Sequence, residues 1–231
     1  MRISSAEIKL LPLCSHRLPL VHTCVWPLTL ASLARSQDVQ HIVFPITADS
    51  TKLHDPSLPP IEPAALFKAL TTNTGKAVHP FPSETFTKIL LDPPCSALGL
   101  RPRLSLKGST AADVNSFAMY QRGFVHSAIR LLKVDGHLVY STCTYNPDEN
   151  EKMVAFILET YPCMRILDVG SAYGKFGLAG CGLDEAARKC VRRFDCSGRE
   201  DFVSNKGEVE RELDSIGFFV AKFEKIEPFK E

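Results

Sequence analysis

Two cysteines in this 231-residue chain stand in segments that suit them for covalent chemistry. Cys95 follows Asp92 by three residues, and the two prolines between them stiffen the turn. Cys143 stands between an apolar run and a predicted helix start, where unpaired backbone amides favour the thiolate. Because the thiolate is the reactive form, we predict Cys143 as a nucleophile. A rigid strand exit and a buried structural cysteine are the alternatives for the two segments.

Strands that alternate with helices are expected to position these segments. We predict buried strands over apolar runs and helices over runs with helical spacing, the last helix opening at an Asn146 cap. The strands are 41–46, 88–91, 137–141 and an edge strand at 216–223; the helices are 64–70, 116–133 and 147–160. This alternation indicates an α/β fold with a mainly parallel sheet.

Three candidate site residues follow directly after predicted strands. Asp49, Asp92 and Cys143 each come just past the end of an apolar run. Ligands of open α/β sheets bind at the carboxyl ends of the strands. We therefore expect these three residues at one edge of the sheet.

The two cysteine segments together resemble a known pair of motifs. Asp-Pro-Pro-Cys-Ser at 92–96 is followed, 48 residues after its cysteine, by Ser-Thr-Cys-Thr at 141–144. This pair resembles the motifs of the Sun-type RNA cytosine-5 methyltransferases over roughly residues 40–225. The C-terminal run 214–223 is most similar to the sixth eukaryotic member of the family, which acts on transfer RNA.

The resemblance implies a Rossmann-like class I methyltransferase fold, the cofactor S-adenosylmethionine and an RNA partner, most simply a tRNA. It implies that Cys143 adds to carbon 6 of cytosine and that Cys95 assists release of the methylated base. Asp92 then hydrogen-bonds the cytosine ring nitrogen and lies at the cofactor, while Asp49 matches the position that holds the cofactor near its adenine. Since a stacked base cannot be attacked at its edge, the target must be unpaired or flipped.

The chain departs from the family pattern upstream of Asp49. Family members carry a glycine-rich cofactor loop there, whereas the first glycine of this chain is Gly75. We expect the first βαβ part to be missing, with 1–40 an irregular or non-native leader and 41–231 the C-terminal part of the methyltransferase domain. The glycine-bearing stretch 165–175 resembles a substitute cofactor loop, but its place after the predicted helix favours an ordinary loop.

The composition is that of a soluble globular domain. With 27 Lys+Arg against 26 Asp+Glu, the net charge is +1, so any nucleic-acid contact must come from local patches. Two basic clusters are candidates for such contacts or for solvated faces: Arg101, Arg103 and Lys107, and Arg188, Lys189, Arg192 and Arg193.

Cysteine usage and hydropathy bear on the compartment. Eight cysteines without a Cys-x-x-Cys pair predict reduced thiols and no structural metal, in a cytoplasmic or possible nuclear location. Prolines interrupt the apolar stretch 10–34, so we expect no membrane span.

Two other functions remain open at this point. Without the glycine loop, the chain could be an RNA-binding or catalytically inactive fragment. An exocyclic-amine methyltransferase also uses Asp-Pro-Pro, but such enzymes usually place an aromatic ring where this chain has Cys95. They also need no nucleophilic cysteine.

Overall fold

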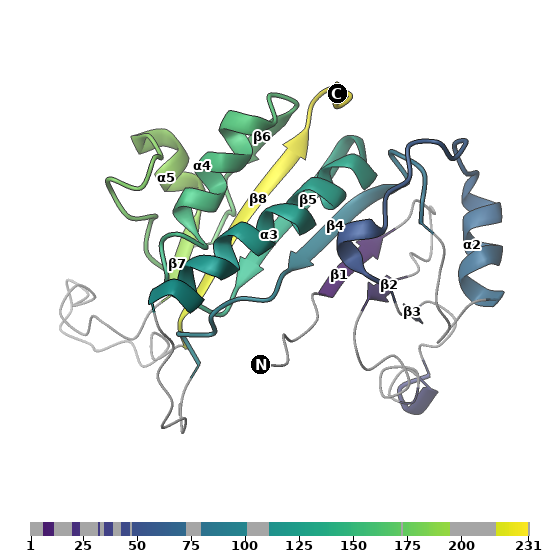
Figure 1. The fold of residues 1–231 in the computed structure, drawn as a ribbon, viewed down its shortest axis with the longest axis horizontal. Helices are drawn as coiled ribbons and strands as arrows, with labels where there is room; N and C mark the ends of the chain where they lie inside the picture. Colours follow the sequence, from purple (N-terminus) through teal and green to yellow (C-terminus); the bar gives the residue numbers. More distant parts are fainter. Residues whose placement is uncertain are drawn as a thin grey trace.

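The computed structural model describes residues 7–11, 20–23, 32, 35–38, 43–46, 48–72, 80–100, 111–171, 173–194 and 216–230. Its strands form one mixed sheet in the order β3-β2-β1-β4-β5-β8-β6, with β7 also paired to β8 (Figure 1). The strands are β1 (Glu7–Leu11), β2 (Leu20–Thr23), β3 (Val43–Ile46), β4 (Phe86–Asp92), β5 (Leu132–Thr142), β6 (Met164–Leu167), β7 (Arg192–Phe194) and β8 (Phe218–Lys225). The helices are η1 (Ser50–Lys52), α2 (Pro63–Thr72), α3 (Ala111–Leu131), α4 (Glu151–Thr160) and α5 (Glu185–Cys190).

Most of the described strands run in one direction. β4 and β5 are parallel neighbours, as are β2 and β3. Following the pairings outward from β4, strands β2 to β7 share one direction, while β1 and β8 run against them. The carboxyl ends of β3, β4 and β5 therefore lie at the same edge of the sheet. The predicted α/β fold with a mainly parallel sheet is confirmed.

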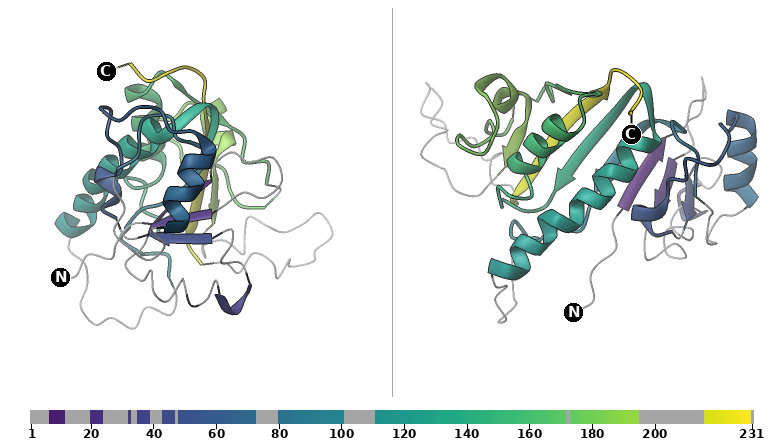
Figure 2. Two further views of the ribbon diagram at one scale, coloured as in Figure 1. Left: turned by 90° about the vertical axis from the view of Figure 1, so that its right-hand side faces the viewer. Right: turned by 45° about the horizontal axis from the view of Figure 1, so that its top comes forward.

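Much of the core lies between the sheet and the helices α3 and α4. Figures 1 and 2 show α3 and α4 side by side on one face, with α3 packed on β4 and β5. The buried face of α3 includes Phe124 and Ala128, which recur at helical spacing. They pack in one cluster with Leu91 of β4 and Leu138 of β5. This packing holds the two strands whose ends carry the cysteine segments.

A buried lysine closes the C-terminal end of α3. The Lys225 ammonium donates to the backbone oxygens of Ile129 at 3.2 Å and Leu132 at 2.8 Å. It also pairs with Glu84 at 3.2 Å. The last carbonyls of a helix lack partners within the helix, and they favour a cation. Lys225 therefore fastens β8 to the end of α3.

The last strand lies inside the sheet, which corrects the prediction of an edge strand at 216–223. β8 pairs with β5 on one side and with β6 and β7 on the other. Its residues alternate, with Phe219, Ala221 and Phe223 buried. Alternation marks a strand with a buried face, but it carries no information on which strands become its neighbours.

The fourth helix begins later than predicted. α4 begins at Glu151, and its cap residue Asn150 makes no side-chain capping bond. Residues 147–150 form turns instead, and the Asn146 side chain accepts from the Asp148 amide at 3.2 Å. The side chains of Asn150 and Glu149 do not cap the helix because they bind residues of the neighbouring loops.

Two short strands lie within residues 1–40, for which we predicted an irregular leader. β1 runs antiparallel to β4, with Ile8 opposite Leu91, and β2 runs antiparallel to β1. An uncovered strand edge presents unpaired backbone groups, and β1 satisfies those of β4. Next to β4 the described residues thus hold an antiparallel pair and not a parallel βαβ unit. The domain boundary at residue 40 stays a prediction.

Within the ranges given above, no helix has the length and hydropathy needed to cross a bilayer. The same residues contain no group of three or more His, Cys, Asp or Glu side chains arranged to hold a metal ion.

Replacing Lys225 tests the fastening of β8 to α3. We expect Lys225→Met to lower the free energy of unfolding by about 1–3 kcal/mol, because the Ile129 and Leu132 carbonyls lose a buried donor. Urea unfolding followed by circular dichroism measures this. Lys222→Met, in the same strand but only partly buried, is the control; an equal loss in both variants would contradict the specific role of Lys225.

Candidate active site

The parallel pair β4 and β5 brings the predicted site residues together. Asp92 is the last residue of β4, and Cys143 directly follows β5. The loop after β4 then returns toward β5, so that the Cys95 sulfur lies 3.3 Å from the Cys143 sulfur. Both thiols are partly buried. The structure therefore joins the two cysteine segments into one site at the carboxyl edge of the sheet.

The two sulfurs share one proton unequally. The Cys95 thiol donates a hydrogen bond to the Cys143 sulfur, and this bond lowers the pKa of Cys143 below its ordinary value. The same bond, helped by burial, raises the pKa of Cys95 far above its ordinary value. Burial and the Asp92 carboxylate act in the opposite direction on Cys143, but they are outweighed. Cys143 is thus the thiol of the pair that loses its proton more readily.

The cause of this thiolate differs from the one expected from the sequence. We predicted that a helix N-terminus next to Cys143 would stabilise the charge. α4 begins only at Glu151, eight residues further on, so its first amides do not directly follow the cysteine. The donor is the second thiol, and the sequence could suggest it only through the pairing of the two motifs.

Close backbone contacts press the Cys95 loop against the Cys143 loop. The Gly99 amide donates to the Cys143 carbonyl at 3.0 Å, and the Gly217 amide donates to the Gly99 carbonyl at 2.9 Å. A β-carbon on Gly99 would lie 2.3 Å from the Gly217 oxygen. Only glycine fits between these two segments. The sequence analysis missed both glycines.

A buried carboxylate lies beneath the cysteines and was also missed as a site residue. Glu149 accepts from the Ser96 amide at 2.9 Å and from the Ser96 hydroxyl at 2.5 Å. It accepts from the side-chain amides of Gln121 and Asn146, each at 2.9 Å. Tyr140 of β5 donates to the Glu149 carbonyl at 2.7 Å. The sequence pattern indicated only a helix-capping role for Glu149.

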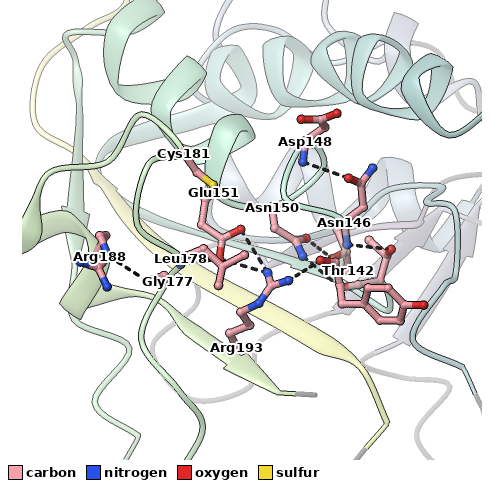
Figure 3. Close-up of polar contacts among 12 residues, drawn as sticks. Thr142, Asn146, Asp148, Asn150, Glu151, Gly177, Leu178, Cys181, Arg188 and Arg193 are labelled. Atoms are coloured by element: carbon pink, nitrogen blue, oxygen red, sulfur yellow. Dashed lines mark hydrogen bonds and ion pairs between the residues drawn. The ribbon is translucent and has the colours of Figure 1, made fainter. Parts of the chain in front are cut away.

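A second buried glutamate connects α4 to β7 (Figure 3). The Arg193 guanidinium donates to the two carboxylate oxygens of Glu151 at 3.0 and 3.1 Å, and it also donates to the Tyr145 carbonyl. The Leu178 amide donates to Glu151 at 3.0 Å. Tyr145 lies two residues after Cys143. This ion pair therefore supports the Cys143 loop from the side of β7.

The basic cluster near residue 190 does not form a free phosphate-binding track. Arg192 and Arg193 are buried and bound within the protein, so the prediction of RNA contact is wrong for them. The other two members pair with Glu185: Arg188 at 2.8 Å and Lys189 at 3.2 Å. A run of charges in a sequence does not reveal such internal partners. The first cluster, 101–107, lies outside the described residues.

Asp49 lies at the expected edge of the sheet, after β3. One carboxylate oxygen accepts from the Thr51 amide at 3.0 Å and from the Thr51 hydroxyl at 2.6 Å, which caps η1. The Thr51 hydroxyl bond is the main cause that lowers the pKa of Asp49. The second oxygen lies 3.4 Å from the Lys52 ammonium, and the side chain is half exposed. An ionised, solvent-facing carboxylate at this edge fits a contact to cofactor hydroxyl or amino groups.

Residues 165–167 belong to β6, and residues 168–171 and 173–175 follow it as a loop, as favoured above, and not as a substitute cofactor loop. The loop leaves β6, which β8 separates from β5. In a Rossmann-like cofactor site the glycine loop leads directly into a helix. Here α5 begins only at Glu185. The described residues thus contain no glycine loop in front of β4.

Comparison with known proteins agrees with this geometry. The crystal structure of NSun6 from Pyrococcus horikoshii with SFG is similar over 85% of this chain and 45% of that chain, with TM-score 0.51 and 27% identity. Residues 67–181 match the sequence model of the family described as 16S rRNA methyltransferase RsmB/F. The fold is thus that of a class I methyltransferase domain, and residues 67–181 belong to the RsmB/F family of Sun-type methyltransferases, which use S-adenosylmethionine.

Two curated relatives show the extent of the likeness. The mouse tRNA (cytosine(72)-C(5))-methyltransferase NSUN6 is 39% identical over 176 residues, which cover 71% of this chain and 37% of that protein. The Arabidopsis thaliana rRNA (cytosine-C(5))-methyltransferase NOP2C is 42% identical over 144 residues, which cover 62% and 23%. The chain therefore spans well under half the length of each relative.

Removing the Cys95 thiol tests the origin of the Cys143 thiolate. We expect Cys95→Ala to raise the pKa of Cys143, because the thiolate loses its hydrogen-bond donor. Alkylation of Cys143 by iodoacetamide, followed against pH by peptide mass mapping, should shift to higher pH. Cys190→Ala, which removes a thiol on α5, is the control; an unchanged profile in Cys95→Ala would contradict the assignment.

Proposed function

We propose that the chain acts as an S-adenosylmethionine-dependent RNA cytosine-5 methyltransferase on a tRNA, through a covalent bond to Cys143. The observation that carries the proposal is the 3.3 Å contact in which Cys95 stabilises a thiolate on Cys143. The tRNA substrate is supported by the relatives named as tRNA cytosine-5 methyltransferases. An exocyclic-amine methyltransferase would have no use for this pair of sulfurs.

A thiolate nucleophile is needed because cytosine does not readily accept a methyl group at carbon 5. Carbon 5 of cytosine is a poor nucleophile, so a bond from the Cys143 sulfur to carbon 6 must first raise the electron density at carbon 5. We propose that Asp92, at the end of β4, hydrogen-bonds the ring nitrogen as this adduct forms. When bound, S-adenosylmethionine supplies the methyl group, and we propose that Asp49 and Asp92 hold it.

The same sulfur contact explains how Cys95 would change its role. The largest cause that raises the pKa of Cys95 is its hydrogen bond to the Cys143 thiolate. Once the Cys143 sulfur is bonded to carbon 6, that negative charge is gone. Cys95 can then release its own proton to solvent more readily, and the resulting thiolate can accept the proton from carbon 5. The electrons of the broken C–H bond re-form the ring double bond and release Cys143 as thiolate.

A fragment that does not bind the cofactor is the second candidate, because the chain has no glycine before Gly75. The thiol pair would then be present without a methyl donor beside it. Binding of the cofactor and trapping of RNA distinguish the two functions.

Trapping of the RNA tests the covalent mechanism. The purified chain is incubated with labelled S-adenosylmethionine and a mixed tRNA pool, and the products are separated on denaturing gels. We expect Cys95→Ala to accumulate a protein–RNA band that resists denaturation, because release is slowed, and Cys143→Ala to give neither band nor labelled RNA. Multiple turnover by Cys95→Ala would refute its release role, and a band in the Cys95→Ala/Cys143→Ala variant would refute the nucleophile.

Calorimetric titration with S-adenosylmethionine tests whether the chain binds the cofactor and whether Asp49 contributes to that binding. We expect saturable heat that weakens about tenfold in Asp49→Ala, because a hydrogen bond to a charged group contributes roughly 1.5 kcal/mol. Asp55→Ala is a matched control, since Asp55 binds Ser57 with the same local geometry, 2.9 Å to the amide and 2.6 Å to the hydroxyl. No saturable heat from the folded wild-type chain would favour the fragment.

A further inference from the structure

We propose that Glu149 is a positioning residue that holds the Cys95 loop on the Cys143 loop and so keeps the two sulfurs in contact. The importance of that contact rests on the proposed function. The experiment that tests the role of Glu149 needs neither RNA nor cofactor, so its failure can be distinguished from a failure of the proposed function.

Glu149 joins three segments of the chain at one point. Ser96, next to Cys95, contributes its amide and its hydroxyl. Asn146, three residues after Cys143, contributes its side-chain amide. Gln121 of α3 contributes the fourth bond, and its other amide proton binds the Pro94 carbonyl at 2.9 Å. The carboxylate thus touches residues on both cysteine loops and on the helix behind them.

This position requires an acceptor at every contact. Four donors from Ser96, Gln121 and Asn146 converge on two oxygens, and an ionised carboxylate is the side chain that only accepts. A glutamine would turn one oxygen into an NH₂ group that faces donors. The Ser96 hydroxyl also contacts the Thr144 hydroxyl at 2.9 Å, which adds a second link next to Cys143.

All four of these donors are neutral, although Glu149 is fully buried. Burying a charge costs free energy unless it is well hydrogen-bonded, and removing any one donor leaves a deficit. Glu151, two residues later, is buried with the charged partner Arg193 instead. The hydrogen bonds of the Glu149 carboxylate described above therefore all go to the two cysteine loops and to α3.

Two opposite effects of Glu149 on Cys143 make the proposal testable. The negative charge of Glu149, like that of Asp92, raises the pKa of Cys143, whereas the bond from Cys95 lowers it. If Glu149 acted only as a nearby charge, neutralising it would lower the pKa of Cys143. If it positions Cys95, the same substitution loosens the sulfur contact and raises that pKa.

The experiment follows alkylation of Cys143 by iodoacetamide against pH in the full chain, with peptide mass mapping of the modified residue. We expect Glu149→Gln to shift the profile to higher pH and to slow alkylation near pH 7 about three- to tenfold, because less thiolate is present. In a Cys95→Ala background, Glu149→Gln should no longer slow alkylation. A profile of the single variant that is unchanged or shifted to lower pH would overturn the proposal.

Two further variants separate positioning from general loosening. Glu151→Gln removes an equally buried acid from the same segment without touching Ser96. Because Arg193 still donates to the Tyr145 carbonyl, we expect this variant to lower the melting temperature and to shift the alkylation profile less than Glu149→Gln does. An equal shift in Glu151→Gln would overturn the proposal. Should Glu149→Gln fail to fold, Ser96→Ala removes one of the four bonds, and a smaller shift to higher pH is expected; no shift would again count against it.

Discussion

The hydrogen bond between two sulfur atoms is the interaction on which the rest of the site depends. Cys95 and Cys143 lie on separate loops, 48 residues apart, and no covalent bond fixes their distance of 3.3 Å. That distance follows from the parallel pairing of β4 and β5, which brings the ends of both strands to one edge. The glycine contact at Gly99 and Gly217 then presses the first loop down onto the second. A shift of either loop by a fraction of an ångström would weaken the bond that makes Cys143 a thiolate.

The buried charged residues near this edge of the sheet have different structural roles. Glu151 pairs with Arg193 and supports the Cys143 loop from β7, while Lys225 pairs with Glu84 and holds β8 to α3. Glu149 receives neutral donors only. Such buried polar contacts add little net stability compared with apolar packing, but each is satisfied only in one arrangement. This requirement for one arrangement explains why a large network of polar contacts surrounds the two small thiols.

Much of the fold could be predicted from the sequence, because periodicity and turn residues report on local structure. The strands around Lys88 and His137, the long helix before Asp135 and the meeting of Asp92 with Cys143 follow from such patterns. Partners distant in the sequence could not be predicted. β8 was expected at an edge because its position late in the chain says nothing of its neighbours, and Arg192 and Arg193 were expected to be exposed because their internal partners lie elsewhere.

The Cys95–Cys143 pair and the proposed cofactor ligand Asp49 are held by different parts of the chain. Most of the residues that bind the two cysteine loops lie between β4 and the start of α4, while Gly217 and Arg193 bind these loops from further along the chain. Asp49 belongs to the turn η1, which contacts α3 through Thr51 and Ser127 but shares none of the bonds around Glu149. None of the bonds described above for the two cysteine loops involves a described residue before β4. In the proposed mechanism, the contact with Cys95 therefore prepares Cys143 independently of Asp49, and Asp49 acts only on the methyl donor.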